Sequence, residues 1–268
     1  MRKNRFIIAA AIVGAVASAA PTDAATVAPA AAAAPVSPIL AARPGAAADS
    51  LPAGITKFAD DAIAYRPPTL APGPHPLIVL LHGAGQSADE LIPVFRSEAD
   101  KRGLILLAPK SAGDTWDLIA SAARFHGKAP KNGELPEFGP DVARIDAALA
   151  AVFKQAAIDP KHIVLAGFSD GAGYALSLGL ANPMLFHGVL AFAPGMMIAP
   201  GRVSLAQRLF IAHGRADRVI PIRVSRDGLA PALAAAGMTM QYRDFVGDHE
   251  VNRKALDEGL TFILRDTP

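Results

Sequence analysis

Cysteine is absent from this chain of 268 residues. Without thiols the protein has no disulfide bond, no thiolate metal site and no cysteine nucleophile. A lipoprotein anchor is excluded as well, because the lipid would be attached to a cysteine. The lack of disulfides does not exclude an oxidising compartment, since a hydrophobic core is sufficient to hold a domain of this size together.

Aromatic residues are also scarce, at 6% of the chain with a single tryptophan. No stripe of basic residues interleaved with aromatics is present, although a nucleic-acid-binding surface would show one. Three of the 26 basic residues lie at positions 2, 3 and 5, and removing them leaves 23 against 24 acidic residues. We therefore expect a nearly neutral mature protein with no nucleic-acid partner.

The N-terminus carries an apolar run that is short for a membrane-spanning helix. The three basic residues precede this run, which extends from Phe6 to about Val16 and is followed by Ala17-Ser18-Ala19. This order is typical of a secretory signal peptide. We therefore predict a signal peptide over 1–19, cleaved near Ala19, and export to the periplasm or the exterior. Retention as an uncleaved anchor is the alternative.

Two regions follow the leader. Residues 20–54 are dominated by Ala and Pro without hydrophobic periodicity, which predicts a poorly ordered linker. A single folded domain is predicted over 55–268, where apolar runs alternate with helical patterns. The predicted strands are 77–81, 103–109, 163–168, 187–194, 208–214 and 238–245, and the clearest predicted helices are 141–157, 222–237 and 250–265. This alternation favours an α/β fold with a mainly parallel sheet covered by helices on both faces. The turn Asp159-Pro160 is expected to close the first of these helices before the next strand begins.

The motif Gly167-Phe168-Ser169-Asp170-Gly171 stands between an apolar, β-branched run and a helical segment. A buried strand that turns sharply into a helix would expose the Ser169 hydroxyl at the edge of the sheet. Glycine on both sides would permit the tight turn and the close approach of backbones. The pattern therefore predicts a G-x-S-x-G nucleophile elbow, whereas an ordinary Gly-Ser turn in the core is the alternative.

A serine hydroxyl is a weak nucleophile unless a base removes its proton and a third group orients that base. His249 lies in a glycine-containing loop after the last predicted strand, and its ring nitrogens suit the role of base. Asp217 follows the strand 208–214 and could accept the remaining N–H of His249. A salt bridge of Asp217 with a neighbouring arginine is the alternative. Asp248 is a second candidate acid, although its adjacency to His249 in sequence suits the role poorly.

Acyl transfer also creates an oxyanion, which fixed N–H donors must stabilise. The backbone N–H of Asp170, directly after the nucleophile, is one expected donor. The loop His82-Gly83-Ala84-Gly85 follows an early strand, and we expect the second donor to be the Ala84 N–H. His82 itself is expected to make structural hydrogen bonds rather than to act as a base.

A long segment of weak periodicity, 110–140, contains Trp116. It would follow the carboxyl end of a strand, where open α/β sheets bind ligands. We consider Trp116, with Phe125 and Phe138, as candidates for lining a substrate pocket. Attachment of the loop to the core is the alternative role for these rings.

Together, the motifs around His82, Ser169, Asp217 and His249 resemble the phospholipase/carboxylesterase branch of the α/β-hydrolases. The segment around Trp116 and the helix from Asp141 are similar to secreted polyhydroxybutyrate-depolymerase-like esterases. The resemblance spans about residues 76–266. It implies an α/β-hydrolase fold with a nucleophile, base and acid at 169, 249 and 217.

One position departs from that resemblance. This branch often carries an uncharged residue where the present chain has Asp170. A carboxylate there suits a helix N-terminus. Aimed into the pocket instead, it would oppose the oxyanion and anionic acyl groups.

We therefore expect a secreted serine carboxylesterase that needs neither a metal nor an organic cofactor. Its substrate would be a small-molecule, lipid or polymer ester. Two alternatives remain: an acyltransferase or peptidase that uses the same three residues, and a hydrolase-shaped binding protein without catalysis. Removal of a halide is disfavoured because Ser169, not an aspartate, occupies the elbow.

Overall fold

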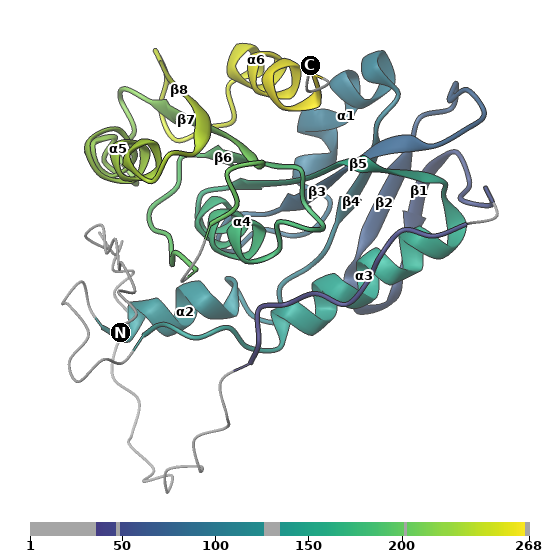
Figure 1. Cartoon of the computed structure of the whole chain (residues 1–268), viewed down its shortest axis with the longest axis horizontal. Helices are drawn as coiled ribbons and strands as arrows, with labels where there is room; N and C mark the ends of the chain where they lie inside the picture. Colours follow the sequence, from purple (N-terminus) through teal and green to yellow (C-terminus); the bar gives the residue numbers. More distant parts are fainter. Residues whose placement is uncertain (1–35, 47–48, 126–134, 201–202, 266–268) are drawn as a thin grey trace, which may run out of the picture.

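A computed structural model describes residues 36–46, 49–125, 135–200 and 203–265. An eight-stranded sheet runs through the molecule with helices on both faces (Figure 1). The strand order is β1-β2-β4-β3-β5-β6-β7-β8. The strands are β1 (Gly54–Lys57), β2 (Ile63–Arg66), β3 (His75–Leu81), β4 (Ile105–Ala108), β5 (Ile158–Phe168), β6 (Gly188–Phe192), β7 (Arg208–Gly214) and β8 (Thr239–Phe245). β2 pairs antiparallel with both β1 and β4, and all pairs from β4 to β8 are parallel.

The helices divide between the two faces of the sheet. They are α1 (Leu91–Arg102), α2 (Asp117–Ala123), α3 (Asp141–Gln155), α4 (Asp170–Ala181), α5 (Ala230–Ala235) and α6 (Arg253–Leu264), with a 3₁₀ turn η1 (Ala59–Asp61) and a π-helical turn η2 (Val224–Leu229). α1 and α6 cover one face, while α2, α3, α4 and α5 cover the other. No helix in the described part of the chain is long and apolar enough to cross a membrane.

Side chains along the central strands point alternately to the two faces of the sheet, and this explains why a hydrophobic core forms on each face. On β3, Leu77, Val79 and Leu81 pack toward α3 and α4, whereas Ile78 and Leu80 pack toward α1. All five side chains are fully buried. Because successive residues of a strand face opposite sides, a continuous apolar run is required where both faces are covered. The α/β fold expected from the sequence is confirmed.

Most predicted elements match the observed ones within a few residues, and 208–214 coincides with β7. The segment Asp159-Pro160 was expected as a turn but lies inside β5. The pairing of β3 with β5 is interrupted there, since His75 pairs with Ile158 and Leu77 with Ile163. The residues between them on β5 project from the ladder, which accommodates a proline that has no N–H to donate.

The predicted linker is too long at its C-terminal end. Residues 36–46 run as an extended segment beside α3 (Figure 1), and Leu40 is buried. The N–H of Leu40 donates to Asn182 Oδ1 at 2.9 Å, and Asp146 Oδ1 accepts the next two backbone N–H groups. The backbone N–H groups of this segment thus donate to side chains of the domain, and not to the carbonyl groups of a neighbouring strand. The predicted signal peptide and residues 20–35 of the linker lie outside the described residues.

Candidate active site

Ser169 is the single residue between β5 and α4. Its φ of 57° and ψ of −121° are rare for a residue with a side chain, and this strain is typical of a functional turn. A Cβ on Gly167 would lie 2.1 Å from Gly171 O, and a Cβ on Gly171 would lie 2.1 Å from Leu81 O. Both flanking positions therefore require glycine for steric reasons. The turn has the geometry of the nucleophile elbow that the motif predicts.

The three residues predicted as nucleophile, base and acid meet at the carboxyl ends of β5, β7 and β8. His249 Nε2 lies 2.9 Å from Ser169 Oγ, and His249 Nδ1 lies 2.7 Å from Asp217 Oδ2. Gly214 lets the His249 loop approach β7, because a Cβ there would lie 2.2 Å from Asp248 O. The arrangement has the hydrogen-bond connectivity of a catalytic triad.

The Asp217 side chain is fully buried and its two oxygens are held separately. Oδ1 accepts from the N–H groups of Val219 and Ile220 at 2.9 and 2.8 Å, which leaves Oδ2 toward the histidine. The alternative salt bridge of Asp217 is not formed. The neighbouring arginines pair elsewhere, Arg215 with Asp244 and Arg218 with Asp248.

Asp248, the second candidate acid, is exposed and faces away from this contact. Its Oδ1 accepts from the backbone N–H groups of Arg218 and His249 at 3.1 and 2.9 Å. These two hydrogen bonds lower the pKa of the Asp248 carboxyl. Asp248 therefore shapes the loop that carries His249, whereas Asp217 is the carboxylate on the His249 ring.

His213 is a component of the site that sequence reasoning missed. Its fully buried Nε2 lies 3.0 Å from Asp217 Oδ2 and 2.9 Å from Ile220 O. Both neighbours are acceptors, so Nε2 carries the proton and Nδ1 accepts from Ser225 Oγ at 2.7 Å. Burial lowers the pKa of His213, which keeps the ring neutral. The only signal in the sequence is its position four residues before Asp217.

The two expected oxyanion donors lie on adjoining segments. In the loop after β3, the Gly83 N–H donates to Gln86 Oε1 at 2.8 Å and the Gly85 N–H to Asp114 O at 2.7 Å. The exposed Ala84 N–H has no acceptor among the described residues. A Cβ on Gly83 would lie 3.3 Å from Ser169 Cβ, so this loop adjoins the nucleophile. The Asp170 N–H, in the first turn of α4, is likewise without an intrahelical acceptor.

Trp116, considered above for lining a substrate pocket, lies in the interior of the protein. It is fully buried, and its Nε1 donates to His82 O at 2.8 Å. Its ring lies 4.9 Å from the ring of His82 and 5.1 Å from that of Tyr174. An apolar ring with one polar N–H is more stable in the core when that N–H finds an acceptor. Trp116 thus attaches its loop to the core, which was the alternative interpretation.

His82 is structural, as expected. Its Nδ1 lies 2.8 Å from Gly83 O, and its Nε2 accepts from the Ser111 N–H at 3.2 Å. Burial lowers the pKa of His82, and the neutral ring fits a nitrogen that accepts a hydrogen bond. Its hydrogen bonds hold the start of the loop after β3.

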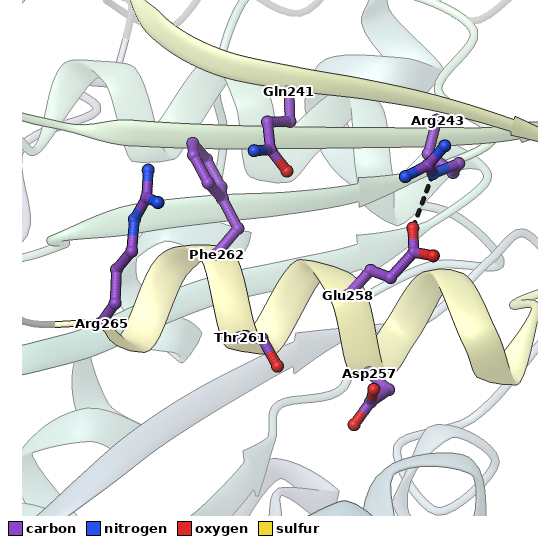
Figure 2. A pocket seen from close by; sticks show the side chains of 7 residues that line it. All are labelled: Gln241, Arg243, Asp257, Glu258, Thr261, Phe262 and Arg265. Carbon is purple, nitrogen blue, oxygen red and sulfur yellow. Dashed lines mark hydrogen bonds and ion pairs between the residues drawn. The ribbon is translucent and has the colours of Figure 1, made fainter.

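A groove of about 340 Å³ lies elsewhere, between β8 and α6 (Figure 2). It contains the ion pair of Arg243 Nε with Glu258 Oε2 at 2.6 Å. None of its lining residues belongs to the Ser169 site; they are Gln241, Arg243, Asp257, Glu258, Thr261, Phe262 and Arg265. Among the residues that the structure describes, no group of three His, Asp or Glu side chains is placed to hold a metal ion.

The sequence of this chain matches one family model and is similar to the sequences of two named relatives. The model of the family described as Phospholipase/Carboxylesterase matches residues 71–265, which is most of the chain. The poly(3-hydroxybutyrate) depolymerase of Ralstonia pickettii is 32% identical over 136 residues, 46% of this chain and 26% of that protein. The acetylxylan esterase of Coprinopsis cinerea is 29% identical over 128 residues, 46% of this chain and 31% of that protein. The aligned part therefore spans less than a third of either relative.

Two solved structures share the fold. Esterase PE8 superposes with a TM-score of 0.57 at 24% identity, over 80% of this chain and 100% of the other. The Bacillus cereus carboxylesterase superposes with a TM-score of 0.54 at 17% identity, over 76% of this chain and 92% of the other. At these identities the likeness concerns the architecture of the sheet and helices.

Proposed function

Since this chain belongs to the phospholipase/carboxylesterase family, we propose that it is a serine esterase that hydrolyses carboxylic esters through an acyl-enzyme on Ser169. The observation that carries the proposal is a chain of two hydrogen bonds through His249. One joins its ring to Ser169 Oγ at 2.9 Å, and the other joins it to Asp217 Oδ2 at 2.7 Å. This chain of hydrogen bonds stands beside two backbone N–H groups without acceptors among the described residues, those of Ala84 and Asp170.

In the first half of the reaction, Ser169 Oγ attacks the ester carbonyl while His249 Nε2 takes its proton. The negative charge on the former carbonyl oxygen is stabilised by the Ala84 and Asp170 N–H groups. The imidazolium then gives its proton to the departing alcohol. In the second half, His249 removes a proton from water, which attacks the acyl-enzyme and releases the acid and Ser169.

Replacement of the nucleophile tests this assignment. Ser169→Ala should lower kcat for p-nitrophenyl acetate by about a thousandfold or more, because the covalent step is lost. The unchanged protein should be labelled at Ser169 by a fluorophosphonate, and the variant should not. Undiminished turnover by a folded variant would overturn the assignment, and a failure to label the unchanged protein would favour a binding protein without catalysis.

The class of ester is inferred from the relatives. The relatives named above are an acetylxylan esterase and a poly(3-hydroxybutyrate) depolymerase, which favours short-chain acyl groups on small or polymeric alcohols. A panel of p-nitrophenyl esters graded by acyl length, with acetylated xylan and polyhydroxybutyrate as polymers, would separate these possibilities. Transfer to alcohol or amine acceptors, or cleavage of peptides, would appear in the product analysis of the same reactions.

We also propose that the enzyme is exported by the leader 1–19. The basic residues, the apolar run and the Ala17-Ser18-Ala19 segment support this. The mass of the protein recovered from the periplasm or the medium should correspond to cleavage near Ala19. Full-length protein in the membrane fraction would support the uncleaved anchor instead.

A further inference from the structure

Asp170 directly follows the nucleophile in sequence and carries a carboxylate, and its backbone N–H is one of the two oxyanion donors of the proposed function. Its side chain is partly exposed, and Oδ2 accepts a hydrogen bond of 2.6 Å from Thr115 Oγ1. No lysine or arginine of the described residues forms an ion pair with Asp170. The negative charge is therefore fixed in place by a neutral hydroxyl.

The loop that carries Thr115 contacts both sides of the oxyanion hole. Three successive residues each make one contact: Asp114 O accepts from the Gly85 N–H at 2.7 Å, Thr115 reaches Asp170, and Trp116 Nε1 donates to His82 O at 2.8 Å. This short segment thus spans the distance between the loop after β3 and the start of α4.

The base of this loop is itself rigidly attached. Asp117 and Asp141, the first residues of α2 and α3, cap each other's helices: each backbone N–H donates to the other's Oδ2, at 2.8 and 2.7 Å. Asp141 Oδ1 also accepts from the Ala112 N–H at 2.7 Å. Because the loop is held at both ends, Thr115 cannot easily follow Asp170 if that side chain turns.

We propose that the Thr115–Asp170 pair is a specificity device that makes the site prefer uncharged esters over anionic ones. This inference rests on the proposed function. A fixed carboxylate that has no ion-pair partner among the described residues repels an anionic substrate group in a partly desolvated site. The Thr115 hydroxyl holds this charge toward the loop that carries Thr115. Thr115 is thus a positioning residue that acts through Asp170.

Two pairs of esters test the proposal, each pair differing in one charge. In 4-acetoxybenzoate and its methyl ester the charge is on the leaving group; in 4-nitrophenyl hydrogen adipate and its methyl ester it is on the acyl group. For each pair, the ratio of kcat/KM for the anionic ester to that for the neutral ester is compared between enzymes, so that intrinsic reactivity cancels. In Asp170→Asn, which has the same shape without the charge, we expect this ratio to rise about tenfold for at least one pair.

Asp257→Asn is the matched control, because this carboxylate lies in the groove of Figure 2 and should leave both ratios unchanged. Ratios in Asp170→Asn equal to those of the unchanged enzyme for both pairs would overturn the proposal. So would an equal rise in Asp257→Asn, which would indicate an effect of net charge. Turnover of the neutral esters and fluorophosphonate labelling test the proposed function separately. A failure of the specificity proposal can therefore be distinguished from a failure of the proposed esterase function.

The positioning role of Thr115 has its own test. Thr115→Val removes the hydroxyl at nearly constant volume, and we expect kcat for p-nitrophenyl acetate to fall about tenfold with little change in KM. Thr115→Ser should restore most of the activity. In the Asp170→Asn background, Thr115→Val should have a much smaller effect, because no charge is left to hold. An equal loss in both backgrounds, or no loss in either, would refute this role.

Discussion

His213 Nε2 and His249 Nδ1 both reach the same oxygen of Asp217, at 3.0 and 2.7 Å. One buried carboxylate thus serves two imidazoles, and only His249 contacts Ser169. The buried ring of His213 is itself fixed by Ser225. It therefore restricts Asp217 to one rotamer, which in turn orients the base.

Replacement of His213 should lower turnover without abolishing it. In His213→Leu the acid retains its two backbone donors and His249 but loses one of the two side-chain donors on Oδ2, so we expect kcat to fall about tenfold to a hundredfold with KM nearly unchanged. Steady-state kinetics on p-nitrophenyl acetate would measure this. His75→Leu also removes a buried histidine, but at the opposite end of the sheet, and should leave kcat unaffected. Equal losses of activity in the two variants would indicate a general effect on the fold.

Stability should decline as the pH falls below neutrality. Burial lowers the pKa of His82, His187 and His213 below the ordinary value of 6.5. Below about that pH the unfolded chain binds protons that the folded protein does not, so the free energy of unfolding falls until the folded-state pKa values are reached. Urea unfolding between pH 7 and 5 measures the slope.

The variant His187→Gln, outside the active site, should make this pH dependence shallower because one of the three rings with a lowered pKa is removed. Met184→Gln changes a nearby exposed residue with no titrating group and should leave the slope as it is. A slope in His187→Gln equal to that of the unchanged protein would show that this ring does not contribute.

The elbow glycines should tolerate no side chain. In Gly171→Ala the new methyl group would meet Leu81 O at 2.1 Å, and neither backbone can move without disturbing β3 or α4. We expect a loss of about 3 kcal/mol or more in the free energy of unfolding, or failure to fold. Gly228→Ala meets nothing within 4 Å and should be neutral or slightly stabilising. A stable, active Gly171→Ala protein would contradict the geometry of the turn.

The extended segment before β1 should contribute to the fold. Leu40 is 1% exposed, and Leu40→Ala should lower the free energy of unfolding by about 2 to 3 kcal/mol through lost burial and a cavity. The neighbouring Ile39 is 59% exposed, so Ile39→Ala should have little effect. Chemical denaturation of both variants compares them directly. Similar stability of the Leu40 variant and the unchanged protein would restore the original prediction of a linker.

The elements with strong periodicity were the most predictable from sequence. The continuous apolar run of β3 and the three- and four-residue spacing in α3 each reflect burial against a flat sheet, so both were expected. The strands β1 and β2 were not predicted, because each has four residues and neither is a continuous run of large aliphatic side chains. The equally short β4, Ile105–Ala108, was predicted because all four of its residues are apolar and buried.

Within the site, residues that belong to recognisable motifs were predictable and their supports were not. Each of the three triad candidates follows a predicted strand: they are Ser169, Asp217 and His249. Because those strands were expected to be parallel, their carboxyl ends were expected at one edge of the sheet. The contacts of Thr115 with Asp170 and of Ser225 with His213 join segments 55 and 12 residues apart. No local pattern encodes such pairs, because they depend on how loops cross once the sheet has formed. For the same reason the sequence left the role of Trp116 open between pocket and core.

The position of β8 at the margin of the sheet determines how the enzyme would lose its activity under denaturing conditions. β8 has a neighbour on one side only, and its carboxyl end leads into the loop of His249, whereas the elbow follows the inner strand β5. Fraying at the margin requires less energy than opening the interior. Mild stress would therefore carry the base away from a nucleophile that is still correctly folded, and inactivation would precede global denaturation.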